Sequence, residues 1–282
     1  MISYQAVTKT YGQVTAVADL DLEIADGEFF GLLGPNGAGK TTIMRMTATL
    51  TAPDAGTIQI DGQPLHRDLI GVKRRIGIVP QYSNLEGDLT AAENLDYHGR
   101  LYGLSRARRR QRTDELLEFA ELTERRADQA KNFSGGMQRK LMIAKTLMHD
   151  PDILLLDEPT VGLDATSRRR IWDLLRQIAS RGMTIFLTTH YLEEAQMLCS
   201  RVGLLDQGHL RTVDSPNNII DGVGRYVLES FIDGTTVQRF FSSQALAYKA
   251  ASSVAGDFQV REANLEDAFI RLTNRKLGDA DV

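Results

Sequence analysis

The chain has 282 residues, 42% of them hydrophobic, and a formal net charge of −4. This length predicts one large domain with an appendage, and the acidic balance argues against nucleic acid as an obligatory partner. The single cysteine, Cys199, excludes an internal disulfide and a thiolate metal cage. No apolar run approaches the ~20 residues that span a bilayer, and Met1 opens no signal-peptide pattern. We therefore expect a cytosolic protein that depends on other chains for any membrane spans.

A glycine-rich loop lies between a predicted strand and a predicted helix near the start of the chain. Residues 17–24 alternate between apolar and polar side chains, and Gly27–Leu33 is an apolar run short enough for a buried strand. The loop Gly34–Thr42 reads Gly-Pro-Asn-Gly-Ala-Gly-Lys-Thr-Thr, which fits the pattern G-x-x-x-x-G-K-[ST]. A helix is expected from Ile43 onward, because no Gly or Pro follows until Pro53. Strand, loop and helix form the context that this pattern requires.

The chemistry of this loop suits a bound nucleotide. Its glycines let successive backbone N–H groups turn toward phosphate oxygens, and the helix that begins near Gly39 adds its positive end. Lys40 would reach the β- and γ-phosphates, and Thr41 would hold Mg²⁺. A glycine-rich surface turn is the alternative interpretation, but such a turn requires neither a lysine nor a threonine at these positions.

The next part of the chain predicts two more strands and then a helical insertion. Residues 57–60 alternate, and the apolar run 76–79 ends at Pro80-Gln81. Apolar residues in the region 82–149 recur at helical spacing among charged residues. The insertion contains a compact basic run, made up of Arg106, Arg108, Arg109, Arg110 and Arg112. A solvated helix face explains this run, and contact with anionic lipid headgroups or with a partner is the alternative.

The segment Asp152–Glu158 predicts a central parallel strand that carries two acids at its C-terminal end. A helix over 165–180 and a buried strand over 183–189 follow, and His190 ends that strand. A helix over 191–199, a strand over 201–206 and a short strand ending near residue 213 complete an α/β arrangement.

The two adjacent carboxylates at the end of this strand suit phosphoryl transfer. Side chains of neighbouring strand residues face different directions, so one acid can hold Mg²⁺ while the other addresses a water molecule. We assign Asp157 to the ion, directly or through a bridging water, and Glu158 to the base or water-orienting role. An acidic pair that only caps the next helix is the alternative for these residues taken alone.

A second helix start suits an anion. Ser134 is a natural N-cap for a helix from Met137 to about residue 148, and Gly135 and Gly136 leave backbone N–H groups open. Cap chemistry alone would also explain this sequence. The last part of the chain, 221–282, predicts a hairpin over 226–232 and 237–241 and helices over 245–253 and 266–275, a small α+β appendage.

With these motifs in order, the sequence resembles the nucleotide-binding domain of ABC transporters over nearly its first 220 residues. The matching motifs are Walker A (Gly34–Thr42), the Q-loop glutamine (Gln81), the signature (Phe133–Met137), Walker B (Ile153–Glu158), the D-loop (Val161–Asp164), the switch histidine (His190) and the aromatic residue that stacks on adenine (Tyr11).

The resemblance implies a fold and a division of the chain. The fold is an α/β P-loop NTPase (RecA-like) core with an antiparallel β subdomain, an inserted helical subdomain and a small α+β C-terminal appendage. Residues 1–220 would form the ATP-binding domain, with the helical subdomain at about 82–149, and residues 221–282 an accessory domain. ATP would bind to the loop residues Gly34, Pro35, Asn36, Gly37, Ala38, Gly39, Lys40, Thr41 and Thr42.

The resemblance also implies an ATPase that works as a head-to-tail homodimer. Each ATP would lie on Lys40 of one subunit and face Ser134, Gly135 and Gly136 of the other. The Asp164 loop would join this interface, His190 would contact the γ-phosphate, and Gln81 would touch Mg²⁺ or water. Closure on ATP would drive a separate transmembrane permease from the cytoplasmic face of the cell membrane, and no nucleic-acid partner is expected.

Two features place the chain within the family. Met137 replaces the usual signature glutamine, which removes a polar group, and Phe133 replaces a leucine. Phe-Ser-Gly-Gly-Met and the tail segment Asn264–Leu272 are similar to the ATPase subunits of drug-resistance, polysaccharide and nodulation-factor exporters. This similarity implies export through a separate permease chain.

Two other functional classes fit this sequence less well. A soluble ABC-type ATPase that acts on ribosomes or DNA usually has two cassettes or a long coiled coil, and this chain has neither. A small-molecule kinase would not need Ser134–Gly136 or His190 in this arrangement.

Overall fold

A six-stranded mixed sheet forms the centre of the molecule. The computed structural model describes residues 1–65, 70–232, 235–254 and 256–273. The strands of this sheet are β3 (Phe29–Leu33), β6 (Ile76–Val79), β7 (Ile153–Asp157), β8 (Thr184–Thr189), β9 (Arg201–Asp206) and β10 (His209–Asp214). Their order is β10-β9-β3-β8-β7-β6, and each neighbouring pair is parallel except β10 with β9. Each of these strands lies where the sequence predicts one.

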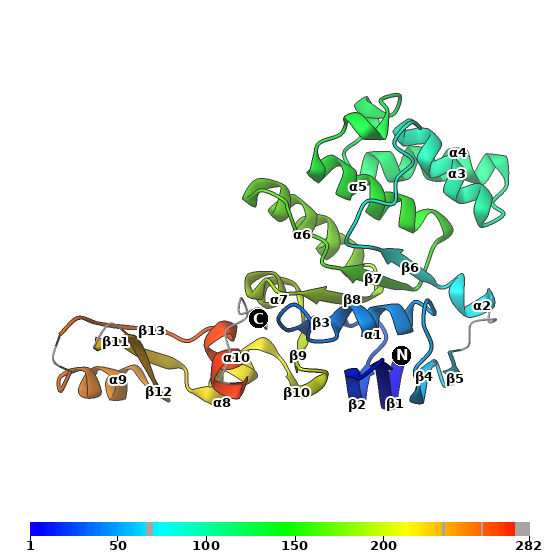
Figure 1. The fold of residues 1–282 in the computed structure, drawn as a ribbon. Helices are drawn as coiled ribbons and strands as arrows, with labels where there is room; N and C mark the ends of the chain where they lie inside the picture. Colours follow the sequence, from blue (N-terminus) through cyan, green and yellow to red (C-terminus); the bar gives the residue numbers. More distant parts are fainter. Residues whose placement is uncertain (66–69, 233–234, 255, 274–282) are drawn as a thin grey trace.

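A four-stranded antiparallel sheet packs below the central sheet (Figure 1). Its strands are β1 (Ile2–Tyr11), β2 (Val14–Ile24), β4 (Ala55–Ile60) and β5 (Gln63–Pro64), in the order β2-β1-β4-β5. The pattern does not predict β1, because its alternation is interrupted: Ala6 has a φ of 49°, and the register with β2 shifts between Tyr4 and Val7.

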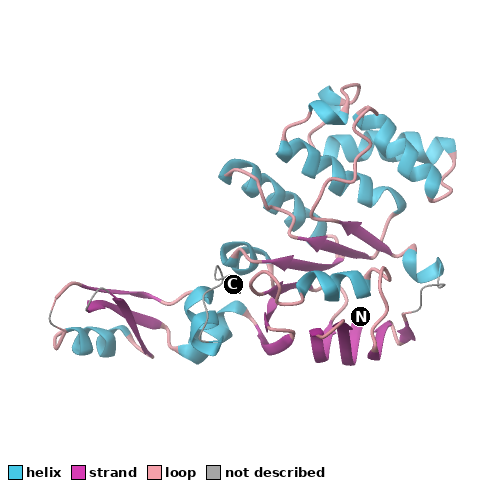
Figure 2. Ribbon diagram, in the orientation of Figure 1, coloured by secondary structure: helices cyan, strands magenta, loops and turns pink. Residues whose placement is uncertain are grey.

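The region between β6 and β7 is helical, as the sequence predicts (Figure 2). Its α-helices are α3 (Ala91–Leu101), α4 (Arg106–Phe119) and α5 (Gly135–Thr146), and its 3₁₀ turns are η1 (Thr123–Arg125), η2 (Ala130–Asn132) and η3 (Leu147–His149). Side-chain caps fix the helix starts: Thr90 and Glu93 form a capping box at α3, and Ser105 and Ser134 cap α4 and α5.

The basic run in this region is only partly a solvated face. Arg108 and Arg112 both pair with Asp150, and Arg109 pairs with Asp96 at 2.6 Å. Three of the five cations therefore tie α4 to neighbouring elements rather than extending freely into solvent.

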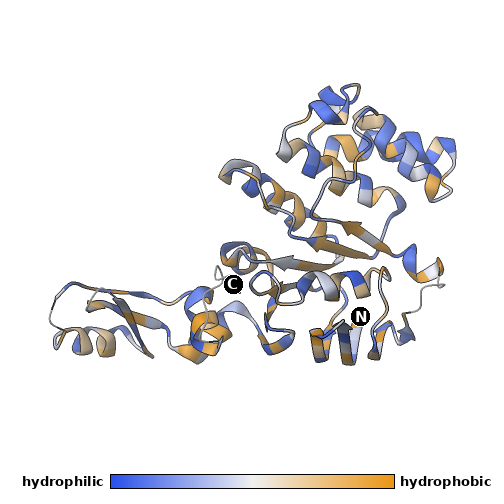
Figure 3. Cartoon of the chain, in the orientation of Figure 1, coloured by the Kyte–Doolittle hydropathy of each residue, from blue (hydrophilic) through white to orange (hydrophobic). Residues whose placement is uncertain are grey.

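Helices cover both faces of the central sheet. The remaining helices of this part are α1 (Lys40–Thr47), α2 (Ile70–Lys73), α6 (Ala165–Ala179) and α7 (Leu192–Leu198). Ile43 of α1 packs between the two sheets with Phe30 and Phe186, and Ile171 of α6 belongs to a second core with Leu154 of β7. Figure 3 shows apolar residues concentrated along the central strands, with polar residues on the outer helices. Among the described residues, no helix combines the length and the apolar character that crossing a bilayer needs.

The C-terminal part extends from this body as an arm (Figure 1). Its elements are α8 (Pro216–Val223), β11 (Tyr226–Ile232), β12 (Thr235–Phe241), α9 (Gln244–Ala251), β13 (Phe258–Glu262) and α10 (Leu265–Thr273). The predicted hairpin is confirmed as the pair β11–β12, although its turn at 233–234 lies outside the described residues. The predicted helix over 266–275 is α10, with 274 and 275 likewise outside. The pattern misses β13, and α10 packs back on α8 and α7.

Candidate functional site

The glycine-rich loop is held by close backbone approaches. Gly37 and Gly39 have φ values of 81° and 109°, a conformation that favours glycine. A Cβ atom at Gly39 would lie 2.2 Å from the carbonyl oxygen of Ala16, and one at Gly34 would lie 2.3 Å from that of Leu205. Packing therefore requires glycine at both positions, and at Gly39 the dihedral angle favours it as well.

Lys40 begins α1 and lies inside the loop. It is buried, and its Nζ donates hydrogen bonds to the carbonyl oxygens of Gly34 at 2.7 Å and Pro35 at 3.0 Å. Nζ also lies 3.5 Å from Oε1 of Glu158. Burial lowers the pKa of Lys40, and the Glu158 carboxylate counteracts this shift. The loop therefore surrounds a partly desolvated cation, which suits an anionic ligand.

The other residues of the loop differ in their exposure to solvent. Pro35 and Ala38 are buried, whereas Asn36 and Thr41 are exposed and Thr42 is half-buried. The N–H of Ala38 donates to Pro35 O at 3.2 Å, which closes the turn. The predicted phosphate-binding pattern thus comprises a loop over 34–39 and the first three residues of α1.

Glu158 lies between two basic side chains. It follows the last residue of β7 with a φ of 48°, and its N–H donates to Thr188 O at 3.0 Å. Its Oε2 atom is 2.8 Å from Nδ1 of His190, opposite the contact with Lys40. Burial raises the pKa of Glu158, but His190 and Lys40 together hold it below its usual value. These contacts favour the ionised carboxylate, the form that can orient a water molecule.

Asp157 occupies a different environment from its neighbour. Its Oδ1 atom accepts a 2.6 Å hydrogen bond from the Thr188 hydroxyl, and its side chain is 8% exposed. Burial raises the pKa of Asp157, while hydrogen bonds from Thr188 and Thr41 lower it. Two of the three residues predicted at Mg²⁺, Thr41 and Asp157, thus lie together and offer the oxygen ligands that Mg²⁺ prefers. The described residues form no cluster of three metal-binding side chains, so phosphate or water oxygens would have to complete the coordination.

The second predicted anion site forms a separate group. The Ser134 hydroxyl accepts the N–H of Met137 at 3.3 Å as the N-cap of α5. A Cβ atom at Gly136 would lie 2.8 Å from the Ser167 hydroxyl, and Asp164, the N-cap of α6, accepts the N–H of Ser167 at 2.9 Å. The signature and the predicted D-loop are therefore neighbours, beside a cavity of about 240 Å³.

The structure does not bring all predicted residues into one cluster. Among the described residues, no hydrogen bond or ion pair joins the Ser134 group to the Lys40 loop. A Cβ atom at Gly135 would lie 3.4 Å from the Leu163 side chain. Tyr11 lies exposed at the end of β1, and Gln81 is half-buried after β6. The predicted site residues thus form separate groups within one chain.

Sequence reasoning missed the supporting residues of the site. Thr188 holds both Asp157 and the backbone of Glu158, and Glu194 accepts hydrogen bonds from Thr160 and Trp172 while fully buried. A polar pair, Thr188-Thr189, at the end of an otherwise apolar strand was the available signal for the first of these.

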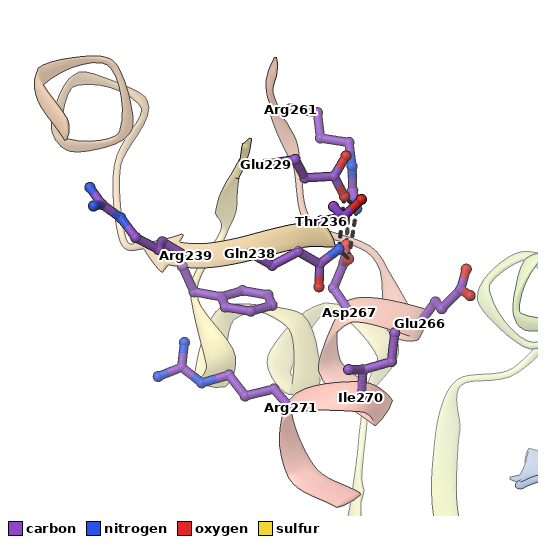
Figure 4. A pocket seen from close by; sticks show the side chains of 10 residues that line it. Glu229, Thr236, Gln238, Arg239, Arg261, Glu266, Asp267, Ile270 and Arg271 are labelled. Atoms are coloured by element: carbon purple, nitrogen blue, oxygen red, sulfur yellow. Dashed lines mark hydrogen bonds and ion pairs between the residues drawn. The ribbon is translucent and has the colours of Figure 1, made fainter. Parts of the chain in front are cut away.

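A cavity of about 960 Å³ lies in the C-terminal arm and not at the loop (Figure 4). Its wall is an ion-pair network in which Arg261 bonds Asp267 at 2.6 Å and Glu229 at 2.6 Å. Asp267 is 1% exposed and hydrogen-bonded to Arg261 and to the N–H of Asn264. This network therefore attaches α10 to the three-stranded sheet β12-β11-β13.

Comparison with known proteins decides the family. The sequence profile of the ABC transporter family matches residues 17–161. The Nod factor export ATP-binding protein I of Paraburkholderia xenovorans (strain LB400) is 40% identical over 99% of this chain and 98% of its own length. The protein of the same name from Mesorhizobium japonicum is 40% identical over 98% of this chain and 87% of its own length.

The chain belongs to the ABC transporter family. It is an ATP-binding subunit of such a transporter. Among solved structures, the ATP-binding cassette MJ0796 as a post-hydrolysis dimer with ADP and Pi is 33% identical, with a TM-score of 0.69 over 76% of this chain and 98% of that one. The structure of cbiO1 from Clostridium perfringens, at 24% identity and a TM-score of 0.72 over 77% of this chain and 89% of that one, shares the fold. The predicted P-loop α/β fold of the subunit is thereby confirmed.

Proposed function

We propose that this ATP-binding subunit hydrolyses ATP at the Gly34–Thr42 loop. The observation that carries the proposal is the position of Glu158, an ionised carboxylate between Lys40 and His190. ATP phosphates would take the place of the carbonyl and carboxylate oxygens that surround Lys40. Glu158 would then orient the attacking water and accept its proton, while Lys40 and His190 stabilise the charge that develops on the γ-phosphate.

We further propose Thr41 and Asp157 as the protein ligands of Mg²⁺, with Gln81 near the ion or the attacking water. The ion would neutralise phosphate charge in the transition state. The buried Asp157 carboxylate supports this assignment, because its desolvation is offset when a cation is present.

The two separate partial sites support a head-to-tail homodimer. Ser134, Gly135, Gly136 and the Asp164 loop would complete the nucleotide site of a second copy, and Tyr11 would stack on adenine. The dimeric state of the related cassette MJ0796 is consistent with this arrangement.

We propose that ATP-driven closure of this dimer energises export through a separate permease at the cytoplasmic face of the membrane. The names of the two relatives, Nod factor export ATP-binding proteins, support export. Residues 1–220 would form the ATPase, with the helical subdomain at 82–149, and 221–282 an accessory unit. Nucleic acid has no part in this proposal.

The test is the recovery of partners of tagged Glu158→Gln protein from gently solubilised membranes in the presence of ATP. The proposal predicts that a multi-span membrane protein is recovered with the variant, and that Lys40→Met protein recovers less of it in the same medium. Recovery of ribosomal or DNA-associated proteins instead would contradict the transporter role.

A further inference from the structure

The outer edge of the central sheet is closed by side chains rather than by another strand. Among the described strands, β6 ends the sheet order, so its outward carbonyl groups have no strand partner there. Residues of α5 and η3 contact them instead: the Thr146 hydroxyl is shared between Met142 O at 2.9 Å and Ile78 O at 3.2 Å, and His149 Nε2 lies 3.2 Å from Ile76 O. The helix that begins at the signature therefore lies along this edge.

The same helix continues these contacts beyond β6, along the segment that contains Gln81. Arg139 donates from Nη1 to Pro80 O at 2.7 Å and from Nη2 to Gln81 O at 2.9 Å. Lys145 donates to Asn84 O farther along. One planar guanidinium thus binds two consecutive carbonyl groups, a two-point contact that fixes orientation as well as distance.

Burying the Arg139 guanidinium costs desolvation free energy that a purely structural contact would not require. Arg139 is 6% exposed, and among the described residues no carboxylate pairs with it at ion-pair distance. Burial lowers its pKa, and the more distant charges of Glu194 and Asp157 counteract this shift. An apolar side chain would fill the same space without desolvating a cation.

The position of Arg139 connects the two halves of the proposed mechanism. It lies five residues after Ser134 on one uninterrupted helix, about 7.5 Å along the axis. A helix of this length is stiff, so a displacement of the Gln81 backbone that pulls on Arg139 also displaces the Ser134 end.

We propose that Arg139 is a positioning residue that makes the Gln81 segment and the Ser134 end of α5 move as one unit. Nucleotide at the Lys40 loop, sensed at Gln81, would set the position from which Ser134 meets the nucleotide of the second copy. This inference rests on the proposed function, because it assumes that Ser134 faces the nucleotide of a partner subunit.

The test compares Arg139→Met and Arg139→Lys with Thr146→Val, each in the Glu158→Gln background. Thr146→Val is the matched control. It removes a contact of α5 with Ile78 in β6 and leaves the contacts of Arg139 with Pro80 and Gln81 in place. Two quantities are measured: ADP affinity, and the protein concentration at which Mg²⁺-ATP produces dimers in sedimentation.

We expect ADP affinity to stay within about twofold of the parent in all three variants, and Arg139→Met to need about 10-fold more protein to dimerise. Arg139→Lys restores one of the two contacts and should recover part of the loss. Thr146→Val should melt at a lower temperature yet dimerise like the parent. Dimerisation of Arg139→Met at the parent concentration, or a parallel loss of ADP affinity, would overturn the inference.

A parent that fails to dimerise would count against the proposed function rather than against Arg139. Amide hydrogen exchange of residues 134–138 in the monomer then decides. The inference predicts that ATP alters this exchange in the parent and not in Arg139→Met. Equal responses of the two proteins, or no response in the parent, would contradict it.

Discussion

Glu158 departs from β-strand geometry at the point where chemistry is expected. Its φ of 48° is uncommon for a residue with a side chain, and such conformations cluster at functional sites. The turn sends its carboxylate between Lys40 and His190, while Asp157 points toward Thr188. Strand alternation predicts that the two acids diverge, but the structure reaches that result by ending β7 at Asp157.

Gly39 offers a test of the loop itself. Gly39→Ala places a Cβ atom where the carbonyl oxygen of Ala16 would lie 2.2 Å away, at a φ of 109°. We expect this variant to lose about 10-fold or more in ATP affinity and 1 to 3 kcal/mol of stability, because the loop must shift. Isothermal titration with ATP and thermal melting measure the two effects. Gly62→Ala, also at positive φ but with open space around it, is the control and should retain ATP affinity.

Lys40 contributes charge that an apolar chain of similar length cannot replace. Lys40→Met keeps most of the buried volume but removes the hydrogen bonds to Gly34 and Pro35 and the ion pair with Glu158. We expect ATP affinity to fall about 100-fold, because charge-assisted contacts to phosphate are lost. Binding of a fluorescent ATP analogue measures this, and an unchanged dissociation constant would refute the role of Lys40.

At the scale of elements, helix α3 meets η3 through a half-buried aromatic cluster. The His149 ring stacks on the Tyr102 ring with centroids 3.7 Å apart, and the His98 ring centroid lies 5.6 Å from that of His149. Burial, with His149 and Lys145 nearby, lowers the pKa of His98 to about 4. Burial also lowers the pKa of His149, against the opposing effects of Ile76 O and Asp150.

The cluster predicts that acid loosens this part of the protein. Between pH 6.5 and 4 an unfolded histidine binds a proton that the folded His98 does not. The unfolded state then binds more protons, so stability falls as the pH decreases through this window, by about 1 to 3 kcal/mol. Melting temperatures at pH 7 and pH 5 measure this. His98→Phe should reduce the difference, whereas a substitution at the exposed His209, His209→Gln, should leave it as in the wild type.

The attachment of α10 depends on one buried carboxylate. Asp267 accepts from both guanidinium nitrogens of Arg261 and from the N–H of Asn264. Asp267→Ala leaves Arg261 without this partner in a half-buried position, and we expect a loss of about 2 to 4 kcal/mol in the stability of the arm. Protease sensitivity of residues 224–273 reports it. Glu266→Ala, the neighbouring acid, should have little effect, and equal sensitivity of the two variants would contradict the prediction.

Sequence patterns predicted the elements that follow local rules. The strands with unbroken apolar runs, such as β7, and the helices with clear caps, such as α5, lie where expected. The pattern missed β1, where bulges break the alternation, and β13, whose five residues alternate weakly. The contacts of Arg139 could not be predicted, because its acceptors lie 58 and 59 residues away and belong to the backbone, which carries no sequence signal.

At the scale of the whole molecule, the family could be predicted from the sequence, and the resemblance also implied that Lys40 and Ser134 of one chain serve different nucleotide sites. Among the described residues, no hydrogen bond or ion pair joins the residues around Lys40 to the capped helix start at Ser134. In the proposed dimer, a second copy would bring the two groups together. In the arm, the buried apolar side chains of α8 and α10 pack against each other. Among its described residues, none belongs to either group.

The most direct test of this account is the rate of phosphate release from Mg²⁺-ATP by purified wild-type and Glu158→Gln proteins at matched ATP occupancy. The account predicts that the wild-type protein releases phosphate and that Glu158→Gln, which keeps the shape but loses the basic carboxylate, is slower by about 100-fold or more. Hydrolysis by Glu158→Gln at the wild-type rate would contradict the assignment of Glu158, and with it the mechanism proposed for this subunit.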